Sequence, residues 1–89
     1  MDTKQGWHVY VLRCADGSYY VGVTQDVEKR ILVHNAGHAS AHTAGRRPVQ
    51  LVYTEFCGTK SVARKRENEI KGWARAKKEA LIRGHEGAR

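Results

Sequence analysis

Two tyrosines stand ten residues apart in short runs that are otherwise typical of β-strands. Tyr10 lies in VYVLRC and Tyr20 in YYVGVT, and a turn signal containing Asp-Gly separates the runs. A two-residue turn would place Tyr10 opposite Val23, and a longer loop would shift this pairing. In either case the tyrosines are expected to be neighbours on adjacent strands rather than directly opposed. A phenol can donate a hydrogen bond or transfer a proton, so the pair is a candidate for chemistry as well as for packing.

The segment after the second run places two polar side chains on one helical stripe with two apolar ones. Its members follow the i, i+3, i+4, i+7 spacing of a helix and are Val27, Arg30, Ile31 and His34. A helix packed on a sheet normally keeps this stripe apolar. Either the two polar side chains lie at its border and reach solvent, or they point together into a cleft beside the sheet. In a cleft, the guanidinium could bind a phosphate and the imidazole could handle a proton.

A basic run further along the chain, RKRENEIKGW, contains two glutamates. On a helical wheel, Glu67 and Glu69 flank opposite edges of an apolar cluster. Each carboxylate could form exposed ion pairs along the helix, or it could hold a divalent cation such as Mg²⁺, which commonly takes only one or two protein carboxylates. Periodicity leaves the choice between the two glutamates open.

Three histidines recur at every fourth residue. On one continuous helix, His34, His38 and His42 would stack their imidazoles as a zinc site. Gly37 and Ser40 interrupt that helix, and no Cys or further His lies nearby in the sequence. The pattern therefore disfavours zinc.

The elements that must position these residues follow from local patterns. The predicted elements are strands over 7–14 and 18–24, a helix from the cap Asp26 to about Asn35 with a stop at Gly37, a loop over 36–47, a strand over 49–56 opened by Pro48, a helix from the cap Ser61 to about Trp73, and a helical segment over 74–84 ending at Gly84. The order β-β-α-β-α-α predicts an α+β fold, in which a small three-stranded antiparallel sheet is flanked by helices. Strand alternation points Tyr19 to the face opposite Tyr20.

Length and charge limit the classes of protein to consider. The 89 residues are 40% hydrophobic and 28% charged, which predicts one globular domain over 1–89 with its core at about 7–83. The net charge is +7, and it is uneven: residues 1–57 hold six Lys and Arg against five Asp and Glu, whereas residues 58–89 hold ten against four. A basic face fits nucleic acid first and an anionic membrane surface second, although a solubilising helix surface would give the same charge.

Two further features narrow the setting in which the protein works. No apolar run approaches the roughly 18 to 20 residues needed to span a bilayer, and MDTKQGWHVY lacks the apolar stretch of a signal peptide. We therefore expect a cytoplasmic protein that does not use a membrane. Cys14 and Cys57 are too few and too far apart for a disulfide framework or a paired zinc knuckle, and both are expected to stay reduced.

Taken together, these residues resemble a known family. The segments that carry the resemblance are VYVLRCADGSYYVGVT, RILVHNAG, HTAGRRPVQLVYTE and RENEIKGWARAKKEALI. They are similar to the GIY-YIG nuclease domain, in its branch of small single-domain bacterial proteins, from about Trp7 to Ile82. The first motif of the family falls on residues 8–10, where only the tyrosine is kept. The second falls on residues 20–22 and departs only by a valine for isoleucine.

The resemblance also assigns residues outside the two strands. The helix arginine of the family matches Arg30, the histidine that follows it in many members matches His34, and the metal-binding glutamate matches Glu67. Glu79 stands where some nucleases of the family have an asparagine. His42 replaces a tyrosine found in close relatives, either as a harmless loop change or as a new phosphate contact.

What the resemblance implies is phosphodiester hydrolysis that depends on one Mg²⁺ or Mn²⁺ held by Glu67. Tyr10 would act as general base toward the attacking water, with its pKa lowered by Arg30 and the metal. Arg30 would also stabilise charge on the phosphoryl oxygens. Tyr20 would orient water or phosphate, and His34 would relay a proton or fix Tyr10.

The expected substrate is DNA, with structured or damaged DNA and a role in DNA repair among the options, and a protein partner could supply specificity. The basic residues expected to give sequence-independent affinity for the nucleic-acid backbone are Arg46, Arg47, Arg64, Lys65, Lys71, Lys77 and Lys78. Two rival hypotheses are a DNA- or RNA-binding module that has lost catalysis and a basic interaction protein with an acidic partner. The presence of Tyr10, Tyr20, Arg30, His34 and Glu67 as a set favours the nuclease.

Overall fold

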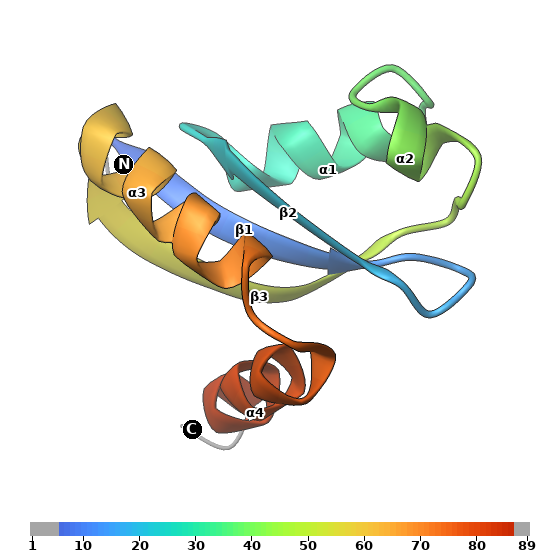
Figure 1. The fold of residues 1–89 in the computed structure, drawn as a ribbon. Coiled ribbons are helices and arrows are strands. Elements are labelled where there is room, and N and C mark those ends of the chain that lie inside the picture. The colour runs from blue at the N-terminus through green and yellow to red at the C-terminus, as the bar shows by residue number, and fades with distance from the viewer. Residues whose placement is uncertain (1–5, 87–89) are drawn as a thin grey trace.

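The computed structural model describes residues 6–86, which form a three-stranded antiparallel sheet with helices on both faces (Figure 1). In chain order the elements are β1 (Trp7–Arg13), β2 (Tyr19–Thr24), α1 (Val27–Asn35), α2 (Ala41–Ala44), β3 (Gln50–Gly58), α3 (Lys60–Lys71) and α4 (Arg75–Glu86). Strand β1 is central and pairs with β2 on one side and β3 on the other. The predicted fold class and sheet are confirmed.

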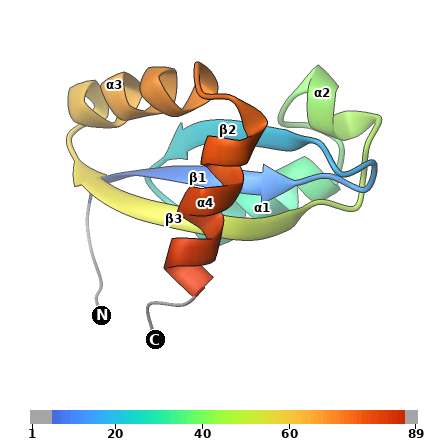
Figure 2. The ribbon, with the colours of Figure 1, turned by 60° about the horizontal axis from the view of Figure 1, so that its bottom comes forward.

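The alternation of β1 side chains builds two cores. On one face, α1 covers a cluster made of Tyr10, Leu12, Cys14 and Val49 with Tyr20, Ile31 and Leu51. On the other face, α3 and α4 cover a cluster whose buried members are Val9, Val11, Val21, Ala63, Ile70 and Ile82 (Figure 2). Tyr19 packs against this second cluster, so its predicted orientation away from Tyr20 is confirmed.

The β1–β2 turn is one residue longer than the two-residue turn considered above. The Cys14 N–H donates to the Ser18 carbonyl at 2.8 Å, which leaves three residues in the loop. The last of them, Gly17, has a φ of 87°, a conformation that glycine adopts without steric cost. As a result Tyr10 pairs with Gly22 rather than with Val23.

Helix α1 begins as the sequence predicts, but α3 begins earlier. The Asp26 side chain accepts the Lys29 N–H at 3.1 Å and caps α1. At α3 the cap is Thr59, whose hydroxyl oxygen accepts the Val62 N–H at 3.2 Å, and Ser61 lies inside the first turn. The prediction of Ser61 as the cap is wrong because the chain already turns at Gly58, where φ is 84°, and the next residue is the first that can cap.

Two further predictions are corrected by the structure. The predicted loop over 36–47 contains the short helix α2, whose cap Ser40 accepts the Thr43 N–H at 3.2 Å. Helix α4 does not end at Gly84 but continues to Glu86. A glycine in a helix costs only about 1 kcal/mol relative to alanine, so it weakens the last turn without stopping it.

The helices are short. The longest, α3 and α4, have 12 residues each. Among residues 6–86, none of the helices is both long enough and apolar enough to cross a membrane.

Candidate active site

Tyr10 and Tyr20 lie on the same face of the sheet, two residues apart along the paired strands. Tyr10 is opposite Gly22, and Tyr20 is opposite Leu12. The tyrosine ring centroids are 6.3 Å apart. The hairpin therefore makes the tyrosines close neighbours that are not directly opposed, as predicted.

Gly22 leaves the space that the Tyr10 ring occupies. A Cβ atom at Gly22 would lie 2.5 Å from the Tyr10 hydroxyl oxygen and 2.6 Å from Cζ. The ring thus lies against the bare backbone of β2, and any side chain at position 22 would displace it. The sequence argument gave Gly22 no role, although a glycine inside a strand pattern is a signal for such a close approach.

His34 joins the two tyrosines from α1. Its side chain is fully buried, and Nε2 lies 2.8 Å from the Tyr10 hydroxyl. Its ring centroid is 5.0 Å from that of Tyr20 and 5.7 Å from that of Tyr10, both in edge contacts. Three side chains far apart in the sequence therefore form one contact group beneath α1.

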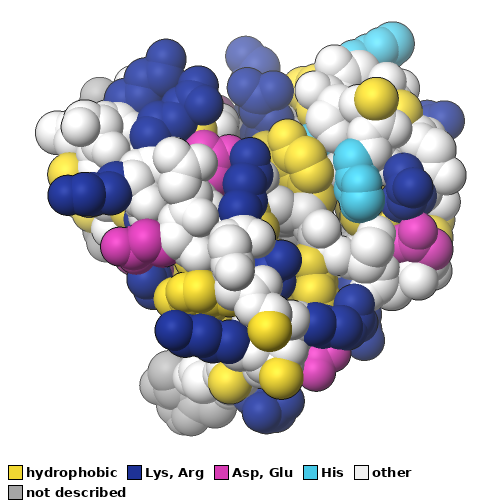
Figure 3. Space-filling model, in the orientation of Figure 1, with side chains coloured by type: hydrophobic (Ala, Val, Ile, Leu, Met, Phe, Trp, Pro, Cys, Tyr) yellow, Lys and Arg dark blue, Asp and Glu magenta, His cyan; other side chains and the backbone are white. Residues whose placement is uncertain are grey.

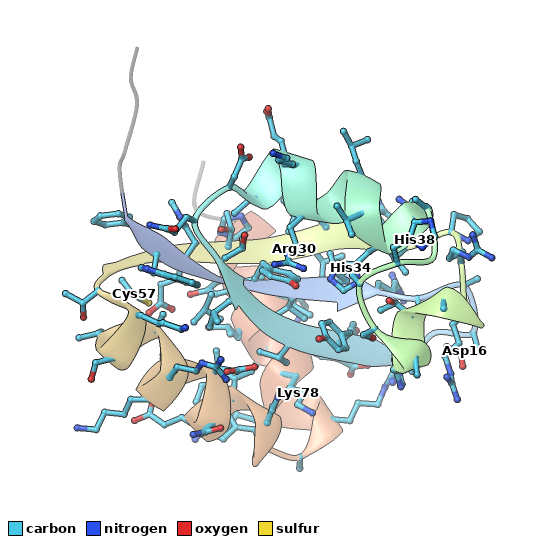
Figure 4. All side chains as sticks on the ribbon, turned by 90° about the horizontal axis from the view of Figure 1, so that it is seen from above. Asp16, Arg30, His34, His38, Cys57 and Lys78 are labelled. Carbon is cyan, nitrogen blue, oxygen red and sulfur yellow. The ribbon has the colours of Figure 1, made fainter. Side chains whose placement is uncertain are left out.

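Arg30 lies one helical turn before His34, and Figure 4 shows both on the sheet side of α1. Arg30 is half-buried, and its positive charge acts on both Tyr10 and His34. Both side chains therefore face the sheet, with His34 fully buried and Arg30 partly open to solvent.

The two glutamates of α3 have different surroundings. The Glu67 side chain is 7% exposed, and its carboxylate lies 3.0 Å from Lys71 Nζ and 3.9 Å from Arg64 Nη1. Glu69 is 54% exposed and pairs with Arg66 at 3.1 Å. The charge of Glu67 also acts on Tyr10. Glu67 is therefore the more buried of the two carboxylates, and its charge acts on Tyr10, a difference that helical periodicity could not reveal.

Burial sets the protonation of the site. It raises the pKa of Tyr10 above the usual range of a phenol; Tyr20 adds to that effect, Arg30 opposes it, and Glu67 raises the pKa further. Arg30 lowers this pKa, as expected, but in the protein by itself burial outweighs the guanidinium. Burial also lowers the pKa of His34, and Arg30 lowers it further. At neutral pH the phenol therefore carries its proton and the imidazole is neutral.

Glu67 is the carboxylate among the candidate site residues, and its oxygens are suitable ligands for a hard cation. Across residues 6–86, no three His, Cys, Asp or Glu side chains lie together as a metal site. Mg²⁺ commonly takes one or two carboxylates and completes its shell with water and phosphate oxygens, so a single buried carboxylate fits it. The ion would compete with Lys71 for Glu67. A zinc site is not formed by the three histidines, because His34 binds Tyr10 and Thr43 while His42 stacks on Tyr20.

The predicted nucleic-acid-binding residues fall into two groups. Arg46 and Arg47 bind the protein itself, through Asp16 at 2.9 Å and the Ala44 carbonyl at 2.8 Å. The others lie on α3 and α4. On α3, Arg64 and Lys71 flank Glu67, and Lys65 is exposed. On α4, Lys77 Nζ lies 4.3 Å from the Trp73 ring centroid, and Lys78 is half-buried. Figure 3 shows Lys and Arg side chains gathered over α3 and around α4 on this face.

Two polar residues that sequence reasoning left without a role support the site. Thr43 is fully buried, and its hydroxyl lies 2.8 Å from His34 Nδ1. The amide of Asn35 bonds both backbone groups of Val49, at 2.8 and 3.2 Å, and so joins the end of α1 to the start of β3. Asn35 directly follows His34, which was a usable signal, whereas nothing local connects Thr43 to a residue nine positions earlier.

The comparisons with known proteins agree with this geometry. A family model described as the GIY-YIG catalytic domain matches residues 6–80. A UPF0213 protein from Staphylococcus saprophyticus is 53% identical over 75 residues, which cover 84% of this chain and 92% of that protein. One from Halobacterium salinarum is also 53% identical over 75 residues, with coverage of 84% and 97%.

Solved structures give the same result. The solution NMR structure of a UPF0213 protein from Bacillus halodurans has a TM-score of 0.60 and 42% identity, and the match covers 91% of this chain and 86% of that one. The solution NMR structure of a protein from E. faecalis has a TM-score of 0.63 and 40% identity, with coverage of 93% and 88%. The matched residues 6–80 include both tyrosines, α1 and Glu67, and the chain is therefore a member of the GIY-YIG family.

Proposed function

We propose that this protein is a divalent-metal-dependent endonuclease that hydrolyses phosphodiester bonds in DNA. The observation that carries the proposal is the convergence of Tyr10, Tyr20 and His34 into one contact group, with the charges of Arg30 and Glu67 acting on it. An ordinary packed core would not require phenols from two strands beside an imidazole and a guanidinium from a helix. Membership of the GIY-YIG family supports the same reaction class.

Tyr10 and His34 provide a route for the proton of the attacking water. The Tyr10 hydroxyl lies 2.8 Å from Nε2 of a neutral imidazole. As the phenol accepts a proton from water, it can pass its own proton to Nε2. This route does not require a free phenolate at neutral pH, so it is compatible with the raised pKa of Tyr10.

Arg30 and Tyr20 act on the phosphate. The guanidinium of Arg30 is fixed in charge and suited to the oxygens of a phosphoryl group, where negative charge increases in the transition state. Arg30 also lowers the pKa of His34. This favours release of the proton from the imidazole, which returns to its neutral form after each turnover. Tyr20 packs edge-on against His34 at 5.0 Å and would orient the water or the phosphate by a hydrogen bond.

Glu67 is the residue that would hold the Mg²⁺ or Mn²⁺ ion. When bound, the metal supplies Lewis-acid stabilisation of the scissile phosphate and the leaving oxygen. In its absence Lys71 and Arg64 neutralise the carboxylate, which prevents an unpaired buried charge.

The substrate we propose is DNA, bound mainly through its backbone. The Lys and Arg side chains of α3 and α4 lie on the same side of the sheet as Glu67 and give affinity without base readout. Choice of a target then depends on DNA structure, such as a branch, a flap or a lesion, or on a protein partner.

The proposal is tested by incubating the protein with supercoiled, branched, flapped and single-stranded DNA in Mg²⁺ or Mn²⁺, with EDTA as control. We expect nicking of at least one substrate, lost in Glu67→Ala and reduced about 10²-fold or more in Tyr10→Phe. Glu69→Ala is the matched control, because Glu69 is an exposed neighbour on the same helix. Cleavage that survives in Glu67→Ala would overturn the proposal.

A second candidate function is a nucleic-acid-binding module without catalysis. It is favoured by the neutralisation of Glu67 by two basic side chains, since such a carboxylate also has a structural explanation. No cleavage of any substrate, together with salt-sensitive binding, would select this function. Retention by an acidic protein without nucleic-acid affinity would instead select the interaction protein.

A further inference from the structure

Within residues 6–86, the one side chain that hydrogen-bonds Nδ1 of His34 comes from helix α2. Thr43 is fully buried, and its hydroxyl oxygen lies 2.8 Å from Nδ1. A neutral imidazole carries one hydrogen, on Nδ1 or on Nε2, and only the nitrogen without a hydrogen can accept. The group bonded to Nδ1 therefore affects whether Nε2 can accept the hydrogen of the Tyr10 hydroxyl.

At the Thr43 end, a backbone carbonyl favours one direction of these bonds. Thr43 has one hydroxyl hydrogen. The Ser40 carbonyl, 3.3 Å away, can only accept it, whereas the Ser40 hydroxyl, also 3.3 Å away, can accept it or donate to the Thr43 oxygen. When Thr43 donates to this carbonyl, its oxygen is an acceptor for the Nδ1–H of His34. This arrangement places the hydrogen of the imidazole on Nδ1.

The Tyr10 end requires the same tautomer. The buried phenol keeps its hydrogen and must donate it. Within the described part of the chain, His34 Nε2 is the only group that hydrogen-bonds the Tyr10 hydroxyl, at 2.8 Å. Nε2 must therefore be without a hydrogen, which agrees with the result from Thr43.

The position of Thr43 is itself fixed. The Ser40 hydroxyl accepts the Thr43 N–H at 3.2 Å, and the Ala44 N–H bonds the Ser40 carbonyl at 3.0 Å. Arg46 donates to the His42 carbonyl at 2.9 Å and pairs with Asp16 of the hairpin turn. Four hydrogen bonds thus tie α2 to itself and to the β1–β2 turn, and the hydroxyl that faces His34 has little freedom to move.

We propose that Thr43 is a positioning residue, whose hydroxyl accepts the Nδ1–H of His34 and so holds the imidazole in the tautomer that accepts the Tyr10 proton. The catalytic consequence rests on the proposed nuclease function, but the tautomer itself does not. Thr43 acts through His34 and touches neither substrate nor metal. The short helix α2 is thereby part of the site.

The tautomer is measured by long-range ¹H–¹⁵N NMR of the histidine side chains in the full chain at neutral pH. We expect the wild-type His34 ring to carry its hydrogen on Nδ1 alone. In Thr43→Val each tautomer leaves one buried N–H or O–H without an acceptor, so we expect a mixture of the two. Thr43→Ser keeps the hydroxyl and should restore the single form. A hydrogen on Nε2 in the wild type, or an unchanged single tautomer in Thr43→Val, would overturn the proposal.

Two other variants keep the test decisive if Thr43→Val does not fold. Ser40→Ala removes the cap of α2 but keeps the carbonyl that accepts the Thr43 hydroxyl, so His34 should keep its tautomer. Tyr10→Phe removes the other partner of His34, and the hydrogen should remain on Nδ1 because Thr43 still accepts it. Loss of the Nδ1–H form in Tyr10→Phe would show that Tyr10, not Thr43, sets the tautomer.

Activity gives a second and separate readout. If the wild type cleaves DNA, Thr43→Val should slow the reaction about 10- to 100-fold, less than the loss of His34, and Thr43→Ser should recover most of the rate. If the wild type cleaves nothing, the proposed function fails while the NMR result still decides the role of Thr43. A Thr43→Val protein with a mixed tautomer and full activity would show that the tautomer is without catalytic consequence.

Discussion

At the scale of single residues, the position of Tyr10 depends on the absence of a side chain at Gly22. In Gly22→Ala the new Cβ would meet the Tyr10 ring at 2.5 to 2.6 Å, so the ring must move away from His34. We expect a loss of stability of about 1 to 3 kcal/mol by denaturant unfolding, as for an overpacked core, and loss of the Tyr10–His34 bond by NMR. Gly45→Ala is the control because Gly45 lies outside the helices, its φ is −89° and its Cβ would meet nothing within 4 Å. An unmoved Tyr10 resonance in Gly22→Ala would contradict the prediction.

The neutral state of His34 has a consequence for stability against pH. Burial and Arg30 hold the pKa of His34 below its ordinary value of 6.5, so the unfolded chain binds more protons than the folded one as pH falls below 6.5. The unfolding free energy should therefore decrease as pH falls through this range. Above pH 6.5, His34 should cause no change of the unfolding free energy with pH. The measurement is the unfolding free energy from pH 7.5 down to pH 5 in the wild type and in His34→Gln. The variant should have a shallower slope, and equal slopes would refute the assignment.

At the scale of secondary-structure elements, α1 must begin at the right residue to present Arg30 and His34 to the sheet. Asp26 fixes this start by accepting the Lys29 N–H. We expect Asp26→Ala to lower the unfolding free energy by about 1 kcal/mol, and Asp26→Asn to lower it much less because asparagine also caps helices. Thermal or urea unfolding of the two variants compares them directly. Equal losses of unfolding free energy in the two variants would mean that the negative charge of Asp26, rather than its capping hydrogen bond, stabilises the start of α1.

The strands and the longer helices could be predicted because each carries a repeating pattern or a cap. Strand alternation placed Tyr19 and Tyr20 on opposite faces correctly, and Asp26 marked the start of α1. The four residues of α2 are too few to show a helical period, so the sequence indicated only a loop there. Thr59 and Ser61 are both cap-forming residues two positions apart, and only the backbone turn at Gly58 distinguishes them.

The candidate site was predictable to the extent that its contacts are local or belong to a family motif. The hairpin alone made Tyr10 and Tyr20 neighbours, although their register depended on the left-handed conformation of Gly17. The bond between His34 and Thr43 crosses a turn and a helix, and no periodicity relates such residues. Burial decides which ionised state a side chain takes, and it is a property of the packed molecule, so the raised pKa of Tyr10 could not be obtained from residue types.

At the scale of the whole molecule, the site takes side chains from both layers of the fold. Arg30 and His34 come from α1 on one face of the sheet, and Glu67 comes from α3 on the other. Strand β2 is an edge strand, so no further strand separates these helices beside it. The basic side chains of α3 and α4 belong to the Glu67 side, and DNA bound there would meet the tyrosines at that edge.

The excess positive charge of the last third of the chain predicts how binding responds to salt. Residues 58–89 carry ten Lys and Arg against four Asp and Glu. DNA that is bound through its phosphates releases counterions. The logarithm of the association constant should therefore fall linearly with the logarithm of the salt concentration, with a slope of about −0.9 for each phosphate contact. Fluorescence anisotropy with a labelled DNA duplex, at salt concentrations from about 50 to about 300 mM, measures this dependence.

Two variants of equal charge change test which cations contribute. Lys65 is exposed and pairs with no acidic group within residues 6–86, so Lys65→Gln should reduce the slope by about 0.9 if it contacts a phosphate. Arg46→Gln also removes one positive charge, but its guanidinium is held by Asp16 at 2.9 Å, so the slope should change little. Equal changes in both variants would mean that net charge, and not the surface formed by α3 and α4, attracts the DNA. A salt-independent affinity would contradict a phosphate-dominated interface altogether.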